Sequence, residues 1–125
     1  RLVSTCANNL LHLRDTEGCK GVGARPIGEG PDGGAFSHKL HLAFASCGEG
    51  LTTIVHEDAL DKLSVVQTLK TERGARTMAI DPTTDKIYLP PAQYEPAPTP
   101  APDAPRQRPK IVPNTFKLLV YGPTE

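Results

Sequence analysis

The chain contains an internal repeat, which constrains its fold more than any other feature of the sequence. Residues 35–46 align with residues 79–90 at a spacing of 44 residues, so that Ala35 corresponds to Ala79. Each of the two copies consists of a short apolar segment, a polar turn and a second apolar segment. Apolar runs of this length on both sides of a turn predict a β-hairpin.

A second correspondence extends the repeat toward the start of the chain. Residues 6–13 align with residues 47–54 at a spacing of 41, and Asn8-Asn9 then falls at the same turn as Glu49-Gly50. Asn and Gly tolerate the positive φ that tight hairpin turns require. A period of about 40–45 residues with four strands per unit is typical of β-propellers. We therefore expect an all-β fold, a partial β-propeller of about two and a half to three four-stranded antiparallel blades.

The period divides the chain into a first blade at residues 1–30, a middle blade at 31–73 and an incomplete last blade at 74–125. The expected strands are Leu2–Ser4, Leu10–Arg14 and Val22–Ile27 in the first blade; Gly34–Phe36, Leu42–Ser46, Leu51–His56 and Leu63–Lys70 in the middle blade; and Arg76–Ile80, Lys86–Leu89 and Thr115–Tyr121 in the last. The pattern thus lacks the first strand of the first blade and the fourth strand of the last. Because closed propellers need about four to eight blades, we expect further blades beyond this sequence.

A proline-rich stretch at residues 90–114 interrupts the last blade. The segment from Pro90 to Pro113 holds nine of the thirteen prolines of the chain. Proline has no N–H group and cannot donate to a strand ladder. We therefore interpret the stretch as an extended, polyproline-like loop inserted at a hairpin turn. The alternative is a docking motif for a proline-reading domain.

Charge and cysteine content restrict the function classes. Lys plus Arg and Asp plus Glu number 14 each, and this zero net charge does not favour nucleic-acid binding. The sequence has no apolar run of about 18 residues that would predict a membrane span. The three cysteines, Cys6, Cys19 and Cys47, form no C-x-x-C pair, and their disulfide state is left open. Cys6 and Cys47 match in the repeat, which predicts a small buried residue at that position.

Residues 74–90, Gly-Ala-Arg-Thr-Met-Ala-Ile-Asp-Pro-Thr-Thr-Asp-Lys-Ile-Tyr-Leu-Pro, closely resemble the last blade of bacterial YncE-like, YVTN-repeat β-propeller proteins. The resemblance continues in residues 44–50 and 65–71. It implies a seven-bladed propeller of which this chain carries the C-terminal blades. It also implies export, and we expect a periplasmic or secreted protein. Relatives in that family are mostly of undetermined role, so the resemblance is specific for fold rather than for function.

Three residues are candidates for a ligand site at the channel mouth. Arg76 is expected to begin the innermost strand of the last blade, where its guanidinium group could bind an anion or carboxylate in a bidentate manner. Asp32 lies at nearly the equivalent position of the middle blade, and Arg73 lies in the same rim loop. The alternatives are a structural Arg76 that bonds neighbouring carbonyl groups, an ordinary turn aspartate at Asp32 and a solvated charge at Arg73.

The remaining polar residues suggest no catalytic or metal site. His38 and His41 are three residues apart and His12 and His56 lie on expected strands, so that no tetrahedral zinc set emerges. No serine is surrounded by a G-x-S-x-G elbow, and the glycine-rich residues 28–34 lack the Lys-Ser/Thr of a P-loop. We expect no cofactor and no metal.

The leading hypothesis is a non-enzymatic binding or scaffold propeller of the bacterial cell envelope, with a protein or small molecule bound at the channel mouth. One alternative is a propeller enzyme or redox protein whose catalytic groups lie in blades beyond this sequence. The other is a single-stranded nucleic-acid binder, which needs aromatic platforms and a basic groove. We also expect the chain to associate with itself through exposed blade edges.

Overall fold

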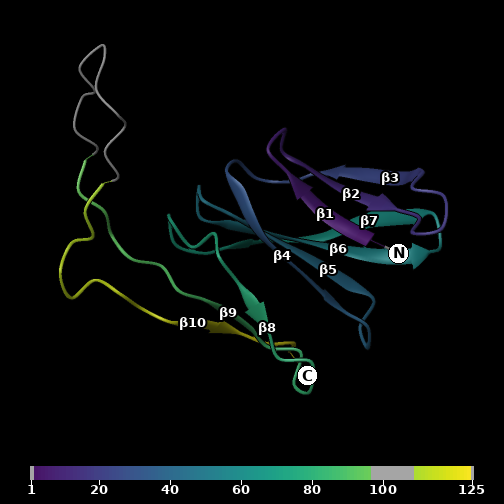
Figure 1. Ribbon diagram of the computed structural model, residues 1–125. Coiled ribbons are helices and arrows are strands. Elements are labelled where there is room, and N and C mark those ends of the chain that lie inside the picture. Colours follow the sequence, from purple (N-terminus) through teal and green to yellow (C-terminus); the bar gives the residue numbers. More distant parts are fainter. Residues whose placement is uncertain (1, 97–108, 125) are drawn as a thin grey trace, which may run out of the picture.

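The computed structural model describes residues 2–96 and 109–124, which form three antiparallel sheets (Figure 1). The first sheet has the order β1-β2-β3, the second β4-β5-β6-β7 and the third β10-β9-β8. Their strands are β1 (Leu2–Cys6), β2 (Leu10–Arg14), β3 (Gly21–Pro26), β4 (Pro31–Ser37), β5 (Leu42–Cys47), β6 (Leu51–Ala59), β7 (Lys62–Lys70), β8 (Ala79–Ile80), β9 (Ile87–Leu89) and β10 (Leu119–Tyr121). The expected all-β fold with antiparallel sheets is confirmed.

The third sheet is shorter than the sequence predicts. A strand was expected from Arg76, but β8 begins at Ala79. The reason lies in the bonding of Arg76, whose carbonyl accepts a hydrogen bond from the N–H of Gly33 in the second sheet at 2.8 Å. β10 likewise begins at Leu119 rather than at Thr115, whose hydroxyl group donates to a loop carbonyl at Val112.

The first and second sheets share one strand register. In the β1–β2 hairpin Cys6 lies opposite Leu10, and in the β5–β6 hairpin Cys47 lies opposite Leu51, a shift of 41 residues in both strands. The next pairing in each sheet contains a register shift after equivalent residues, Leu13 in β2 and Ile54 in β6. β1, β2 and β3 thus occupy the places that β5, β6 and β7 occupy in the second sheet.

The second and third sheets are related by 44 residues. Ala35 of β4 lies opposite Phe44 of β5, as Ala79 of β8 lies opposite Tyr88 of β9. Positive φ values recur at the same spacing: His41 has φ 53° and Asp85 has φ 56°, each just before the second strand of its hairpin. The expected turn at Asn9 and Gly50 is also present, because these residues have φ values of 62° and 101°.

Two apolar layers hold the sheets together. Leu11 and Leu13 of the first sheet pack against Ala43, Ala45 and Val55 of the second, and all five residues are almost fully buried. The opposite face of the second sheet packs against the third sheet, and this layer contains Phe44, Ile54, Ala75, Ile87 and Leu89. The middle sheet therefore buries both of its faces, which explains its nearly continuous apolar strand β5.

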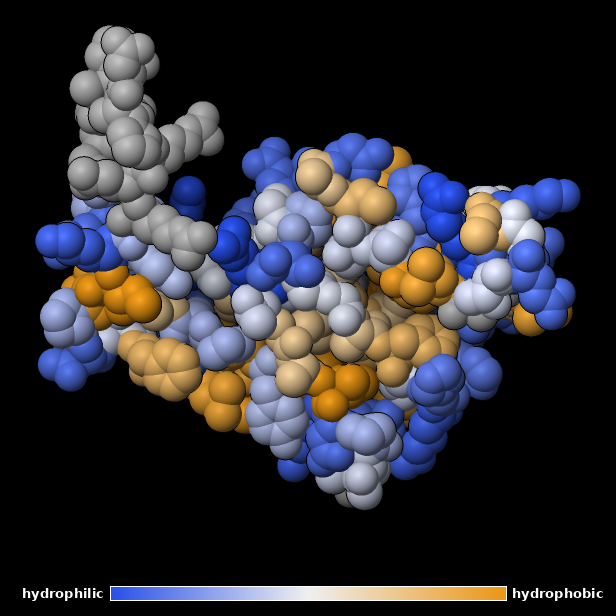
Figure 2. Space-filling model, in the orientation of Figure 1, coloured by the Kyte–Doolittle hydropathy of each residue, from blue (hydrophilic) through white to orange (hydrophobic). Residues whose placement is uncertain are grey.

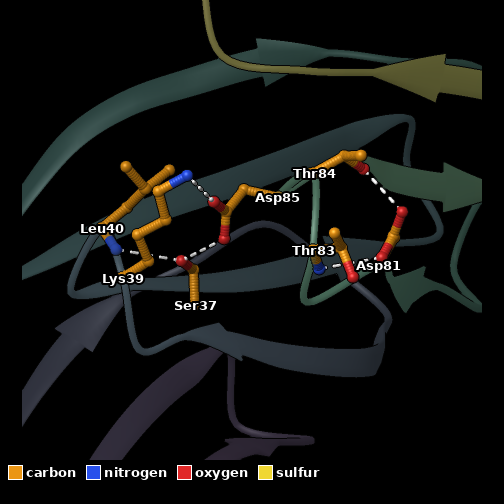
Figure 3. A network of polar contacts seen from close by, with 7 residues as sticks. All are labelled: Ser37, Lys39, Leu40, Asp81, Thr83, Thr84 and Asp85. Carbon is orange, nitrogen blue, oxygen red and sulfur yellow. Dashed lines mark hydrogen bonds and ion pairs between the residues drawn. The ribbon is translucent and has the colours of Figure 1, made fainter.

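A polar contact between two hairpin turns joins the third sheet to the second (Figure 3). The hydroxyl group of Ser37 donates to Oδ1 of Asp85 at 2.6 Å, and Nζ of Lys39 lies 3.7 Å from Oδ2. The Asp85 side chain is only 4% exposed, whereas that of Lys39 is 72% exposed. The hydrogen bond from Ser37 is therefore the buried part of this contact.

The β9–β10 connection contains the whole proline-rich stretch, of which residues 97–108 lie outside the described residues. The described flanks of the stretch pair with each other. Tyr94 and Ile111 form an antiparallel bridge, the N–H of Glu95 donates to Lys110 at 2.8 Å, and that of Val112 donates to Gln93 at 2.9 Å. The bonding residues on both flanks are not prolines, so the ladder forms between them.

Candidate functional site

Three glycine-containing loops lie against one another at one end of the sheets, and together we call them the rim. They are residues 28–30, 48–50 and 71–76. Backbone hydrogen bonds connect them in sequence: the N–H of Gly48 donates to Gly30 at 2.8 Å, and that of Gly74 donates to Gly48 at 2.8 Å. Gly30 and Gly74 have positive φ values of 65° and 87°. The rim is therefore a set of backbone hydrogen bonds that connects loops of successive sheets and positions the side chains of these loops.

The rim brings together two of the three residues expected at the ligand site. Nε of Arg76 lies 3.8 Å from Oδ2 of Asp32, and the hydroxyl group of Thr77 donates to the same oxygen at 3.1 Å. The side chains of Arg76 and Asp32 are 65% and 48% exposed. An ion pair with this exposure contributes about 0–1 kcal/mol to stability, so it adds little to the stability of the fold.

Sequence reasoning did not identify Thr77 or Ser46 as part of this site. The hydroxyl group of Ser46 donates to the Arg76 carbonyl, which also accepts from the N–H of Gly33. The second sheet therefore holds the backbone of Arg76 in place. The repeat with a spacing of 44 residues could have indicated Thr77, because it aligns Arg76 with Asp32 and the following residue with Gly33. The guanidinium group of Arg76 lies beside the Asp32 carboxylate and is exposed, while the main-chain carbonyl of Arg76 accepts the hydrogen bonds from the second sheet.

Arg73 lies in the same rim loop, and its side chain is exposed. Among the described residues its guanidinium group has no hydrogen bond or ion pair. Two of the three acidic rim residues are held by other groups: Oε1 of Glu49 accepts from the N–H of Glu29 at 2.7 Å, and Glu72 pairs with Lys117 at 2.9 Å, while Glu29 itself is exposed. The rim therefore presents two exposed guanidinium groups within one segment of four residues.

A cavity of about 410 Å³ lies elsewhere, between the first two sheets. Its walls are mainly apolar and come from β1, β2 and β4, including Val3, Leu13 and Phe36. The two turn histidines His38 and His41 line it together with Glu57. The turn thus brings His38 and His41 to one cavity, although a strand would have separated them. The ring of His38 meets Phe36 edge-on, with centroids 5.1 Å apart.

A second polar cluster lies beside a neighbouring cavity of about 340 Å³, which His56 and Asp58 help to line. Nδ1 of His56 lies 2.8 Å from Oδ1 of Asp58, and Ser64 donates to the same oxygen at 3.0 Å. These hydrogen bonds lower the pKa of Asp58, and the bond with His56 has a larger effect than the bond from Ser64. Within residues 2–96 and 109–124, no three His, Cys, Asp or Glu side chains are arranged to hold a metal ion.

The three cysteines are free and differ in burial. Cys47 is buried, Cys6 is half-buried and Cys19 is exposed. Burial raises the pKa of the Cys47 thiol, although a hydrogen bond with the Gly28 backbone acts in the opposite direction. A thiol that is held protonated is a poor nucleophile, and this agrees with a structural role for Cys47.

No protein-family model matches the chain, and no curated protein is significantly similar to it. None of the described residues forms a helix with the length and apolar character needed to cross a membrane.

Proposed function

We propose that the chain is part of a β-propeller that acts as a non-enzymatic binding or scaffold protein of the bacterial cell envelope, periplasmic or secreted, and that its rim binds an anionic ligand. The observation that carries the propeller arrangement is the recurrence of the same strand pairs in successive sheets. Pairs in the first sheet recur after 41 residues in the second, and pairs in the second recur after 44 residues in the third.

The apolar layers support the same arrangement. Val3 and Leu13 face the second sheet, and their equivalents Phe44 and Ile54 face the third. One packing rule therefore describes both interfaces, as expected for blades that follow one another around an axis. The resemblance of residues 74–90 to YncE-like proteins is in agreement with this arrangement and supports the location in the cell envelope.

The chemistry of the rim supports an anionic ligand. The backbone of Arg76 is held by hydrogen bonds from Gly33 and Ser46, and its exposed guanidinium group lies with Nε 3.8 Å from Oδ2 of Asp32. Fixing an arginine before binding reduces the entropy that is lost on binding. A planar guanidinium group matches a carboxylate or phosphate group in a bidentate manner. Arg73 adds a second exposed positive charge to the same loop.

Isothermal titration with inorganic phosphate and with a dicarboxylate such as succinate tests this proposal. We expect Arg76→Ala to weaken binding of the responding anion by about tenfold or more, because a hydrogen bond to a charged group contributes about 1.5–3 kcal/mol. Arg14→Ala is the control, since Arg14 is also exposed but lies on β2 and bonds to the carbonyl of Cys19. Equal weakening by both variants, or no effect of Arg76→Ala, would reject the rim as the site.

A further inference from the structure

The two described flanks of the proline-rich stretch, residues 90–96 and 109–117, lie beside the rim, and together we call them the arm. A Cβ atom built on Gly74 would lie 3.5 Å from the carbonyl oxygen of Ala92 and 4.0 Å from Cε2 of Tyr94. Nζ of Lys117 donates to both carboxylate oxygens of Glu72, at 2.9 and 3.2 Å. The arm therefore packs against the rim loop 71–76 and places an aromatic ring next to Gly74.

The aromatic ring of Tyr94 belongs to an exposed apolar pair. Tyr94 and Ile111 are partners in the antiparallel bridge of the arm, and they are 53% and 56% exposed. Cross-strand partners carry their side chains on the same side of a ladder, so the two side chains are neighbours. Glu95 follows Tyr94 in the extended chain, and its carboxylate therefore points to the other side. Tyr94 and Ile111 thus offer a continuous apolar surface beside the rim.

The backbone between this apolar surface and the rim arginines carries no side chains. The N–H of Gly74 donates to the carbonyl of Gly48 at 2.8 Å, so the two glycines lie side by side. The Tyr94 ring is next to Gly74, and Cδ of Arg76 lies 3.9 Å from the Cβ position of Gly48. Arg73, which is exposed, directly precedes Gly74 in the chain. Because glycine has no Cβ atom, a ligand can approach this backbone closely.

We propose that the anion bound at the rim carries a flat aromatic ring, which packs on Tyr94 while its charged group binds Arg76 and Arg73. This inference rests on the anionic ligand proposed above, and it narrows the ligand to an aromatic carboxylate or an aryl phosphate. Aromatic rings attract each other in offset-stacked or edge-to-face arrangements. The planar guanidinium groups supply paired donors for the carboxylate or phosphate oxygens.

The charges of the rim favour such a ligand over a small anion. The carboxylates of Asp32 and Glu29 are exposed there together with the two guanidinium groups. These negative charges offset part of the attraction that the arginines exert on an anion. A simple phosphate or carboxylate ion should therefore bind weakly, whereas contact of a ring with Tyr94 increases the affinity without additional charge.

Isothermal titration of the 125-residue protein can compare phenyl phosphate with inorganic phosphate, and benzoate with acetate. In the pair that responds, we expect the ring to tighten binding by about threefold or more, the effect of one aromatic contact. Tyr94→Ala should remove this gain and leave the affinity for the anion without a ring unchanged. Tyr94→Phe retains the ring and should retain the gain. The pair that responds distinguishes a phosphate ligand from a carboxylate ligand.

Phe116→Ala is the matched control, since Phe116 is a 67% exposed aromatic residue of the same arm but alternates with Leu118 and Val120 on the outer face of the third sheet. Phenyl phosphate or benzoate should also shift the NMR signals of the Ile111 methyl groups in the unchanged protein, which tests the contact if Tyr94→Ala does not fold. Equal affinities within both anion pairs, or equal effects of Tyr94→Ala and Phe116→Ala, would overturn the ring and leave the anion site standing. Absence of binding by all four anions, or no effect of Arg76→Ala on any of them, would reject the anion site as well.

Discussion

Asp85 has an unusual backbone conformation and also makes a buried side-chain hydrogen bond. It adopts a positive φ of 56°, and its carboxylate accepts the buried hydrogen bond from Ser37. Asp85→Ala should lower the free energy of unfolding by about 2–3 kcal/mol, because it loses that hydrogen bond and places a Cβ-bearing residue without a local polar group in the left-handed region. Asp85→Asn retains an acceptor and tolerates this φ, so its effect should stay below about 1 kcal/mol. Urea denaturation measures both, and equal losses would contradict this account.

The residues of the rim show what sequence reasoning can reach at this scale. The repeat placed Arg76 over Asp32, and the structure brings their side chains to 3.8 Å. It did not predict that Ser46 and Gly33 bond the carbonyl of Arg76, because those contacts cross between sheets. A strand pattern encodes which residues face inward, whereas contacts between sheets depend on how closely two backbones approach.

Among the elements, β4 is the strand that sets the distance to the third sheet. A Cβ atom on Gly33 would meet Met78 Cγ at 2.7 Å and the Arg76 carbonyl at 2.8 Å. Gly33→Ala should therefore lower the free energy of unfolding by about 1–3 kcal/mol, the usual cost of overpacking. Hydrogen exchange should increase in β8–β10 and stay unchanged in β1–β3. Gly21→Ala is the matched control, since no atom lies within 4 Å of its Cβ position, and a similar loss in both variants would refute this reasoning.

Strand positions were predicted well where hairpins are local. The second sheet follows the expected strands closely, since each of its turns joins neighbouring segments with clear apolar patterns. β8 is shorter than expected because the carbonyl of Arg76 bonds to the second sheet, and such a non-local bond leaves no periodic signal in the sequence. The segment before β10 continues in the register of the hairpin, with the N–H of Lys117 donating to Pro91 at 3.0 Å, but Pro91 has no N–H to complete the ladder.

At the scale of the whole molecule, the outer face of the third sheet is exposed and apolar (Figure 2). Phe116, Leu118 and Val120 are 67%, 56% and 49% exposed. Val120 is paired with Tyr88 as Ile54 is paired with Phe44, and in the second sheet those side chains are covered by the third sheet. The chain taken alone should therefore associate with itself through this face and the free edge of β10.

Sedimentation velocity over a range of protein concentrations tests this expectation. Leu118→Lys should weaken the association by about tenfold or more, because it places a charge in the apolar contact. Val66→Lys is the control, since Val66 is 54% exposed but lies on β7. A monomer at all concentrations, or equal effects of the two substitutions, would contradict self-association through the third sheet.

The β9–β10 hairpin has a practical consequence for protein engineering. Leu89 faces Leu119 as Ala45 faces Thr53, although 29 positions separate the first pair in sequence and only seven separate the second. The hairpin thus keeps its alignment while accommodating a guest segment of 22 additional residues. Loop closure becomes only slowly more costly with length, so the connection between β9 and β10 should tolerate a grafted affinity tag or a small reporter domain.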